Sequence, residues 1–399
     1  MLFLHSLLTI ISRDDIIVNG YKIKFARVHV KNFINQQDMK EINVADVFSL
    51  VKNRGTLTRK QISEKLGISW GAVSTITAKL IEEGYIVERK AESDGAAGRI
   101  PSYLEVNRSK HFAIGLDVND MGLYAVLVDL TGEVVSEFHS ESDLEDKDTL
   151  LEGIYSLLDS VVNSLGDRHL ICIGVAMQGI VNASAGVSVR IPGRSDWENI
   201  PLAELISQRF SVPTVIEHDP NCILFAARRG KIKDTLLVRV DHGIGMALML
   251  GGRIIDKPGI FELGHTVAVP DGIECNCGKR GCLDQYASIR GLKARSGKKF
   301  HVLISDADIG DKEALKYVND AAKHLAFSIA NAAFLLNVDR IVLCGRLFEY
   351  KDIFWDEFVK YFESFGGNDL PKFSFAEVSA APHGAALIAM GTTLRKISI

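Results

Sequence analysis

One short segment with four metal-binding side chains constrains the fold more than any other part of the sequence. Its ligands are one imidazole and three thiols, at His265, Cys275, Cys277 and Cys282. This is the closed tetrahedral set that structural zinc prefers, and it leaves no open position for a catalytic water. Unrelated buried or redox-active cysteines are the alternative, but the dense Cys-x-Cys-x4-Cys spacing and the polar neighbours disfavour it. The segment therefore predicts a Zn²⁺ ion that fastens a loop.

The chain length and the remaining cysteines set the general class of protein. At 399 residues the chain is too long for one hydrophobic core, so two or three domains are expected. A hydrophobic fraction of 47% and a net charge of -4 are ordinary for a soluble protein and give no whole-chain sign of a nucleic-acid partner. The other cysteines, Cys172, Cys222 and Cys344, lie in apolar or helical segments and require no disulfide. These features favour a cytoplasmic location.

Residues 1–40 form an N-terminal extension to which no role is assigned. Its first eleven residues are mostly apolar, but they lack a basic start and a small-residue cleavage site. The run is also too short to span a bilayer, so no membrane insertion is expected. The extension carries an excess of Lys and Arg, which suits either a contact to DNA or a solvated arm.

Residues 41–107 show the pattern of a winged helix-turn-helix domain. A first helix is expected over 43–54, and a second from a Thr58 cap to Gly67. A third helix begins after Ser69 and places apolar residues inward at Val73, Ile76, Leu80 and Ile81. Two helices joined by a short glycine-containing turn are typical of the motif whose second helix enters the major groove of DNA.

The third helix and the following hairpin supply the candidate DNA-binding residues. We expect small and hydroxyl-bearing side chains, including Thr77, on the solvent-exposed face of the third helix. The candidate DNA-binding residues of this helix are Ser69, Trp70, Gly71, Ser74, Thr75 and Lys79. Strands over 85–89 and 103–106 flank a Gly-rich tip, where Arg99 could reach a narrow minor groove. A protein-interaction domain is the alternative, but the hydroxyl-rich face favours double-stranded operator DNA.

Residues 108–399 contain two similar α/β halves. An antiparallel meander over 111–138 is followed by a related pattern over 236–255, which indicates an internal duplication. Helices are expected at 148–164, 219–229 and 313–337, and strands at 170–176 and 340–344. For the 313–337 helix we favour a role in the core over one in an interface. Two such halves suit a two-lobed actin-like fold with a ligand in the cleft between them.

These features together resemble the ROK family of repressors, open reading frames and sugar kinases. The resemblance covers residues 43–395, and its most specific part is Glu262-x-x-His265 followed by Cys-x-Cys-Gly-x-x-Gly-Cys-Leu. The sequences Glu217-His-Asp and Val240-Asp-His-Gly-Ile-Gly are similar to those of the family's glucose and N-acetylglucosamine repressors. The resemblance implies a winged helix-turn-helix followed by a sugar-kinase fold with a structural zinc loop.

The phosphate-binding loops depart from the kinases of the family. Where the kinases have Asp-x-Gly-Gly-Thr, this chain has Asp117-Val-Asn-Asp-Met, and the second Gly-Thr-Gly-Ile-Gly loop has become Asp241-His-Gly-Ile-Gly. The pair of glycines on the nucleotide side of the kinases has become Cys344-Gly345 here. Lost glycines and added carboxylates oppose phosphate binding. We therefore expect no catalysis, with Asp219 as a vestigial base.

The sugar-binding side is better retained. The resemblance assigns Asp219, Glu262 and His265 to sugar hydroxyls, and residues 193–199, which end in Asn199, to a loop that closes on the sugar. His218 and Asp284 stand where the kinases commonly have Asn and Glu, so they also belong to the expected ligand site. A helix cap is the structural alternative for Asp219, and a surface charge for Glu262. We therefore expect a sugar or a sugar phosphate as the effector.

The sequence thus predicts a sugar-responsive transcriptional repressor. A homodimer or a dimer of dimers is expected, because a symmetric pair reads a palindromic operator with more contacts than one module. One alternative is a sugar kinase with a DNA-binding tail. Another is a regulator without a small ligand, controlled by a protein such as a transporter component.

Overall fold

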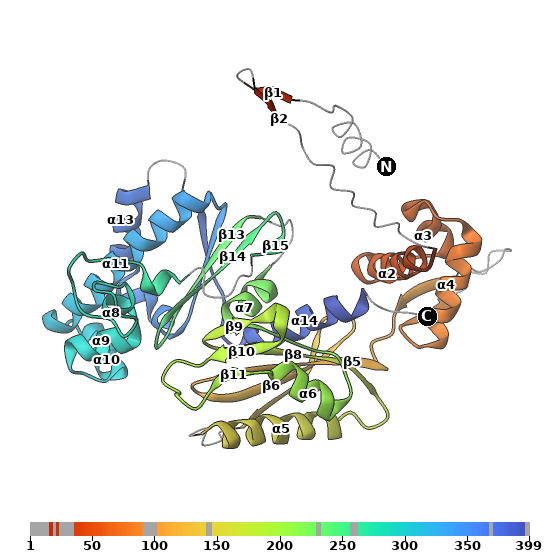
Figure 1. The fold of residues 1–399 in the computed structure, drawn as a ribbon, viewed down its shortest axis with the longest axis horizontal. Coiled ribbons are helices and arrows are strands. Elements are labelled where there is room, and N and C mark those ends of the chain that lie inside the picture. Colours follow the sequence, from red (N-terminus) through yellow and green to blue (C-terminus); the bar gives the residue numbers. More distant parts are fainter. Residues whose placement is uncertain are drawn as a thin grey trace.

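The computed structural model describes the predicted DNA-binding domain and two lobes (Figure 1). The residues described are 16–18, 21–23, 36–90, 102–140, 146–228, 233–255, 262–366 and 370–395. Near the N-terminus, β1 (Ile16–Val18) pairs with β2 (Tyr21–Ile23) in antiparallel register. The wing tip with Arg99 lies outside the described residues.

The DNA-binding domain consists of three helices and a hairpin. Its elements are α2 (Gln36–Arg54), α3 (Arg59–Leu66), α4 (Trp70–Glu82) and the antiparallel strands β3 (Ile86–Lys90) and β4 (Ser102–Val106). The predicted caps are confirmed, because Thr58 forms a capping box with Gln61 and the Ser69 side chain accepts from the Ala72 amide. Gly67 ends α3 in the left-handed conformation. The first helix begins several residues earlier than expected.

The placement of Thr77 on the exposed face of α4 was wrong. Thr77 is fully buried, and its hydroxyl donates to the Ser74 carbonyl and accepts from Arg59 Nε at 3.0 Å. Because Arg59 reaches across from α3, a polar residue on the inner face of α4 finds a partner. A buried hydroxyl is tolerated where its hydrogen bonds are satisfied.

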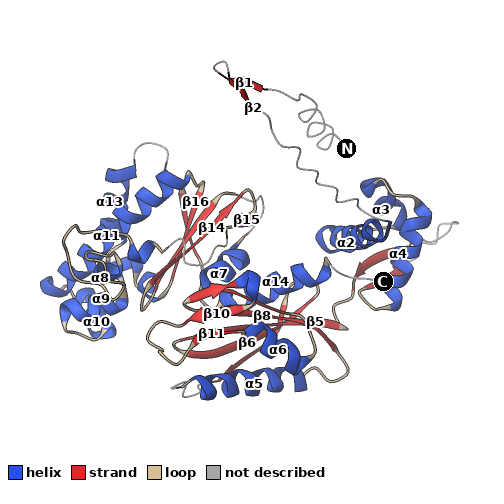
Figure 2. Ribbon diagram, viewed as in Figure 1, coloured by secondary structure: helices blue, strands red, loops and turns tan. Residues whose placement is uncertain are grey.

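Each lobe contains a β-sheet (Figure 2). Both sheets have five strands in the same order, which agrees with the predicted duplication. In each, an antiparallel meander is extended by two parallel strands. The first sheet has the order β7 (Val134–Ser140), β6 (Gly122–Asp129), β5 (His111–Asn119), β8 (His169–Met177) and β12 (Thr214–His218). The second has the order β15 (Arg253–Ile254), β14 (Ile244–Leu250), β13 (Thr235–Val240), β16 (Arg340–Cys344) and β17 (Lys372–Phe375).

Three helices accompany the first sheet. They are α5 (Lys147–Asn163), α6 (Leu202–Phe210) and α7 (Asp219–Ala227), whose first residue follows β12 directly. A small antiparallel sheet of β9 (Ile180–Asn182), β10 (Val187–Arg190) and β11 (Glu198–Ile200) lies beside them, with a 3₁₀ turn at Ala183–Ala185. The buried Trp197 donates from Nε1 to the Ser188 hydroxyl at 2.8 Å, which fixes the loop before β11.

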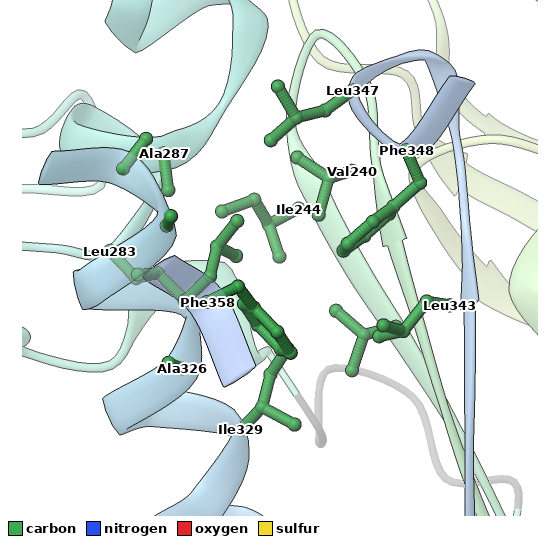
Figure 3. Close-up of a cluster of buried hydrophobic side chains, with 14 of the residues drawn as sticks. Val240, Ile244, Leu283, Ala287, Ala326, Ile329, Leu343, Leu347, Phe348 and Phe358 are labelled. Atoms are coloured by element: carbon green, nitrogen blue, oxygen red, sulfur yellow. The ribbon is translucent and has the colours of Figure 1, made fainter. Parts of the chain in front are cut away.

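The core of the second lobe lies between its sheet and a group of helices (Figure 3). The helices are α8 (Asp284–Ala287), α9 (Ile289–Ser296), α10 (Phe300–Asp308), α11 (Lys312–Leu336), α12 (Arg346–Glu349) and α13 (Trp355–Gly366), with 3₁₀ turns at Leu263–His265 and Lys351–Ile353. Ala326 and Ile329 of α11 pack against Phe358 of α13 and Leu343 of β16. The predicted core role of α11 is therefore confirmed for this face.

The last helix, α14 (Ala380–Leu394), connects the lobes to the DNA-binding domain (Figure 1). Its N-terminal half packs on α7, where an added Cβ at Gly384 would lie 1.8 Å from the Cys222 carbonyl oxygen. Its C-terminal half shares a hydrophobic cluster with the DNA-binding domain, in which Met390 and Leu394 lie with Val47 and Phe48. The same helix thus contacts both α7, which carries Asp219, and the core of the predicted DNA-binding domain.

The structure also bears on the predictions about cysteines and membranes. Cys172, Cys222 and Cys344 are buried, as expected. Burial raises the pKa of the Cys172 thiol to about 12. Among the described helices, none is both long enough and apolar enough to cross a membrane.

The close contact between α14 and α7 can be tested by adding a single methyl group. Gly384→Ala should lower the free energy of unfolding by about 1–3 kcal/mol, because the new Cβ meets backbone that cannot move aside. Gly391 on the same helix has nothing within 4 Å of an added Cβ, so Gly391→Ala is the matched control. The control should be neutral or stabilising by up to about 1 kcal/mol. Equal stability of the two variants in urea denaturation would contradict this account.

Candidate ligand cleft, metal loop and DNA-binding face

A cleft of about 1420 Å³ takes its lining residues from both lobes. Five of the six predicted ligand-binding residues line it, namely His218, Asp219, Glu262, His265 and Asp284. Asn199, the sixth, is exposed on β11 with a φ of 50° and is not among the lining residues. The structure thus brings together carboxylates and imidazoles, side chains that form directional hydrogen bonds with sugar hydroxyls.

Asp219 is held by an arginine from the opposite lobe. Its Oδ2 accepts a hydrogen bond from Arg239 Nη1, and its Oδ1 lies 3.4 Å from His218 Nε2. One carboxylate oxygen is therefore held by the guanidinium, and the other lies near an imidazole. The side chain does not cap α7, whose N-cap residue is His218 without a side-chain bond. In this arrangement Asp219 forms part of an ion pair that joins the two lobes at the base of the cleft.

Arg239 is the central cation at the base of the cleft. Its side chain is 10% exposed, and its Nε donates to Asp241 Oδ2 at 2.7 Å. Burial opposes the charged guanidinium, but the carboxylates of Asp219 and Asp241 outweigh this effect and raise the pKa of Arg239. Asp117 lies close by, and burial raises the pKa of its carboxyl group to about 7. The base of the cleft is therefore a compact ion-pair network that both lobes build.

The two carboxylates nearest the metal loop play different parts. Glu262 is exposed and lines the cleft, so its carboxylate is accessible to a ligand. Asp284 is buried, accepts the Ile244 amide at 3.2 Å and pairs with Arg290 Nη2 at 2.6 Å. Asp284 therefore fixes the turn between β13 and β14. Because both of its carboxylate oxygens are used in these contacts, a direct hydrogen bond to a sugar would compete with them.

The four predicted metal ligands converge on one point. The candidate ligand atoms of His265, Cys275, Cys277 and Cys282 all lie within 4.8 Å of one another. Cys275 Sγ is 3.6 Å from His265 Nδ1, and the Cys277 and Cys282 sulfurs are also 3.6 Å apart. Zinc–sulfur bonds of about 2.3 Å place tetrahedral ligands roughly 3.8 Å apart, so the group fits a zinc ion closely.

Backbone contacts hold the metal loop in place. Gly281 has a φ of 76°, and an added Cβ there would lie 1.7 Å from the Val269 carbonyl oxygen. Tyr286 of α8 accepts the Ile273 amide at 2.9 Å, and the Gln285 amide group lies 3.5 Å from Cys275 Sγ. Because His265 also lines the cleft, the loop connects the candidate metal site to the candidate sugar site.

The predicted DNA-binding residues of α4 form an exposed face. Trp70 is 62% exposed, Ser69, Gly71, Thr75 and Lys79 are also exposed, and Ser74 is half-buried. Beneath this face, the Arg59 guanidinium binds both carboxylate oxygens of Glu88, at 2.6 and 3.0 Å. Since Arg59 also bonds Thr77, it joins α3, α4 and β3 into one unit.

The sequence analysis missed the two arginines that hold the acids of the cleft, Arg239 in the lining and Arg346 behind it. Arg239 stands within the otherwise apolar strand Leu236-Leu-Val-Arg-Val, and this buried position was the available signal. Arg346 follows the degenerate Cys344-Gly345 pair, and its Nε donates to Asp241 Oδ1 at 3.1 Å. Both arginines come from the second lobe and contact acids that flank the cleft.

Comparisons with known proteins agree with the two-part architecture. Residues 46–87 match the model of the winged helix-turn-helix DNA-binding family, and residues 113–394 match that of the ROK family. A putative xylose repressor of Caldicellulosiruptor sp. (strain Rt8B.4) is 26% identical over 352 residues, covering 81% of this chain and 88% of the relative. The DNA-binding transcriptional dual regulator NagC of Escherichia coli (strain K12) is 30% identical over 336 residues, covering 78% and 82%.

Solved structures show the same fold. A ROK family transcriptional regulator, described as a homologue of the E. coli MLC protein, aligns with a TM-score of 0.77 and 21% identity over 90% of this chain and 97% of its own. A ROK family glucokinase from Streptomyces griseus, in complex with glucose and AMPPNP, aligns with a TM-score of 0.61 and 23% identity over 70% and 99%. The glucokinase thus lacks a counterpart for about a third of this chain, whereas the regulator covers most of it.

These comparisons confirm the predicted fold class and the predicted combination of domains, and they favour a regulator over a kinase. The chain belongs to the ROK family, with a winged helix-turn-helix domain before its two-lobed domain.

Proposed function

We propose that this protein is a transcriptional regulator that binds operator DNA through α4 and a carbohydrate in the cleft. The observation that carries the proposal is the position of α14, which contacts α7 at Gly384 and the DNA-binding core at Met390. A ligand that closes the lobes would move α7 and α14, and with them the DNA-binding domain. Repression of carbohydrate genes fits relatives that are named xylose repressor and transcriptional repressor.

The cleft suits binding without turnover. Asp219 is engaged by Arg239, and acids replace glycines at both phosphate loops, at Asp120 and Asp241. A phosphoryl-transfer site needs a free base and a cradle of backbone amides for the nucleotide phosphates. The proposed regulator therefore has no kinase activity, and His218, Asp219, Glu262 and His265 act as ligand-binding residues. Asn199 does not line the cleft in this structure, so it would contact a sugar only if the loop of residues 193–199 moved when the lobes closed.

A homodimer in the cytoplasm is part of the proposal. One winged domain reads few base pairs, and a symmetric pair supplies the specificity that an operator needs. The outer face of α11 offers a surface for this purpose, because Leu335 is 86% exposed and Phe334 is 59% exposed. A transporter component remains a candidate protein partner, and its binding would be measured beside the sugar.

Zinc is the proposed occupant of the His265, Cys275, Cys277 and Cys282 group. The ion would supply a structural cross-link, and these four side chains would hold it through one nitrogen and three sulfurs. One ring nitrogen of His265 would then bind the metal, and the other would be available to a ligand in the cleft. Metal-bound histidines commonly use their second ring nitrogen for a hydrogen bond in this way. The cross-link would keep Glu262, three residues earlier, close to the ligand.

The metal proposal predicts about one zinc per chain in purified protein. Cys277→Ser should abolish zinc retention and lower the melting temperature by about 5–10 °C, because each kcal/mol shifts it by about 2–4 °C in a domain of this size. Cys172 is buried outside the group, so Cys172→Ala is the control and should keep its zinc. Metal analysis beside thermal unfolding decides the matter. Full zinc retention by Cys277→Ser would overturn the assignment.

The DNA proposal predicts sequence-selective and salt-sensitive binding. Selection from a duplex library at low salt should yield a preferred sequence, and the logarithm of its binding constant should fall linearly with the logarithm of salt concentration. Lys79→Gln should weaken binding to all duplexes and reduce the salt slope by about 1, whereas Thr75→Ala should relax the sequence preference at a cost of about 1–3 kcal/mol.

The matched control for Lys79 is the exposed Lys312 on α11, far along the chain from α4. Lys312→Gln should leave both affinity and salt slope unchanged, which fluorescence anisotropy can measure. If no duplex is preferred over a random one, α4 is not a DNA-reading helix and the proposal fails.

A further inference from the structure

Two turns from different lobes meet across the cleft through charged side chains. Asp120 lies at the β5–β6 turn of the first lobe, and His242 lies at the β13–β14 turn of the second. The Asp120 carboxylate forms an ion pair with His242 Nδ1 and lies 3.4 Å from Arg346 Nη2. Asp120 and Arg346 are only 30% and 28% exposed, so solvent screens this contact incompletely.

The cations at this end of the cleft are already neutralised by the chain itself. Arg346 binds Asp241 and Asp120, and Arg239 binds Asp219 and Asp241. Two permanent cations therefore face three carboxylates, and the histidine adds charge only when protonated. A phosphate group entering here would have to displace Asp120 and would then lie beside the remaining acids. Like charges about 5 Å apart in such surroundings lower affinity by tenfold or more.

We propose that Asp120 is a specificity-determining residue that excludes phosphorylated ligands, so that the effector is an uncharged sugar rather than its phosphate ester. The Asp120 carboxylate occupies the point between His242 and Arg346 where a ligand phosphate would find its cations. This inference rests on the proposed sugar-sensing function and names the class of sugar.

Other cations of the cleft do not offset this effect. Arg190, Lys279 and Lys293 line the same cavity, are exposed, and form no ion pair within the described ranges. The half-buried Arg194 donates to the Asp146 carbonyl oxygen, and Arg290 is paired with Asp284. Exposed side chains hold an anion weakly, because water and salt screen the attraction. They mark the rim of the cleft, whereas Asp120 acts where the two lobes face each other.

The test measures binding of inorganic phosphate to the full-length protein by phosphorus NMR or calorimetry. Asp120→Asn keeps the size of the side chain and removes its charge, and it should bind phosphate at least tenfold more tightly than the wild type. Asp120→Glu retains the charge and should behave as wild type. Asp308→Asn, at an exposed acid outside the cleft lining, is the control for loss of one negative charge. Equal phosphate affinity of Asp120→Asn and wild type overturns the proposal.

A second variant locates the gained site. Adding His242→Gln or Arg346→Gln to Asp120→Asn should remove most of the gain in phosphate affinity, with thermal unfolding as a check on folding. If the gain persists in both double variants, phosphate binds elsewhere and the proposal fails. In the wild type, a sugar phosphate such as glucose 6-phosphate that binds more tightly than its parent sugar would also overturn it. Operator binding is measured separately, so loss of the regulatory function would be distinguished from loss of this selectivity.

Discussion

The buried ion pairs of Arg239 join the two lobes at the base of the cleft, and the chemistry of the cleft depends on them. Arg239 belongs to β13 of the second lobe, whereas Asp219 begins α7 after the first sheet. Charges taken out of water are costly, and removal of one partner leaves the others uncompensated. The network therefore persists as a unit in which Arg239 binds Asp219 and Asp241. The exposed Glu262 carboxylate also lines the cleft and stays accessible to the proposed sugar ligand.

The same site is mechanically connected to the DNA-binding domain. Asp219 is the first residue of α7, α7 packs closely on α14 at Gly384, and α14 ends in the core that contains Val47 and Phe48. A second contact joins the domains, because the Tyr85 ring stacks on His111 at 4.4 Å and His111 Nε2 lies 2.8 Å from the Glu83 carbonyl oxygen. Packed helices pass rigid-body shifts to one another because interiors are dense and resist compression. A change in lobe closure thus has a physical route to α4.

Local patterns in the sequence predicted most of the fold. The caps at Thr58 and Ser69, the two meanders and the convergence of the cysteine loop follow from signals that lie within a few residues of each other. The prediction for Thr77 was wrong because helical periodicity within α4 does not reveal a partner on another helix. Arg59 of α3 donates a hydrogen bond to the Thr77 hydroxyl and so allows it to be buried. Arg239 was missed because its acid partners lie elsewhere in the chain. The outcome for Asn199 has a similar cause, since loop placement depends on tertiary contacts such as that of Trp197. The sequence patterns thus failed to predict the contacts between residues that are far apart in the chain.

The central claim is that a sugar in the cleft changes DNA affinity without being phosphorylated. Fluorescence anisotropy of a labelled preferred duplex, titrated with a panel of sugars in the presence of MgATP, tests this claim most directly when ADP release is followed in the same sample. If a sugar binds the free protein and the DNA-bound protein with different affinities, linkage requires that the saturating sugar shift the DNA dissociation constant by the ratio of those two affinities. The account predicts at least a fivefold shift with one sugar and no sugar-dependent ADP. Sugar-dependent ADP release, or unchanged DNA affinity across the whole panel, would contradict it.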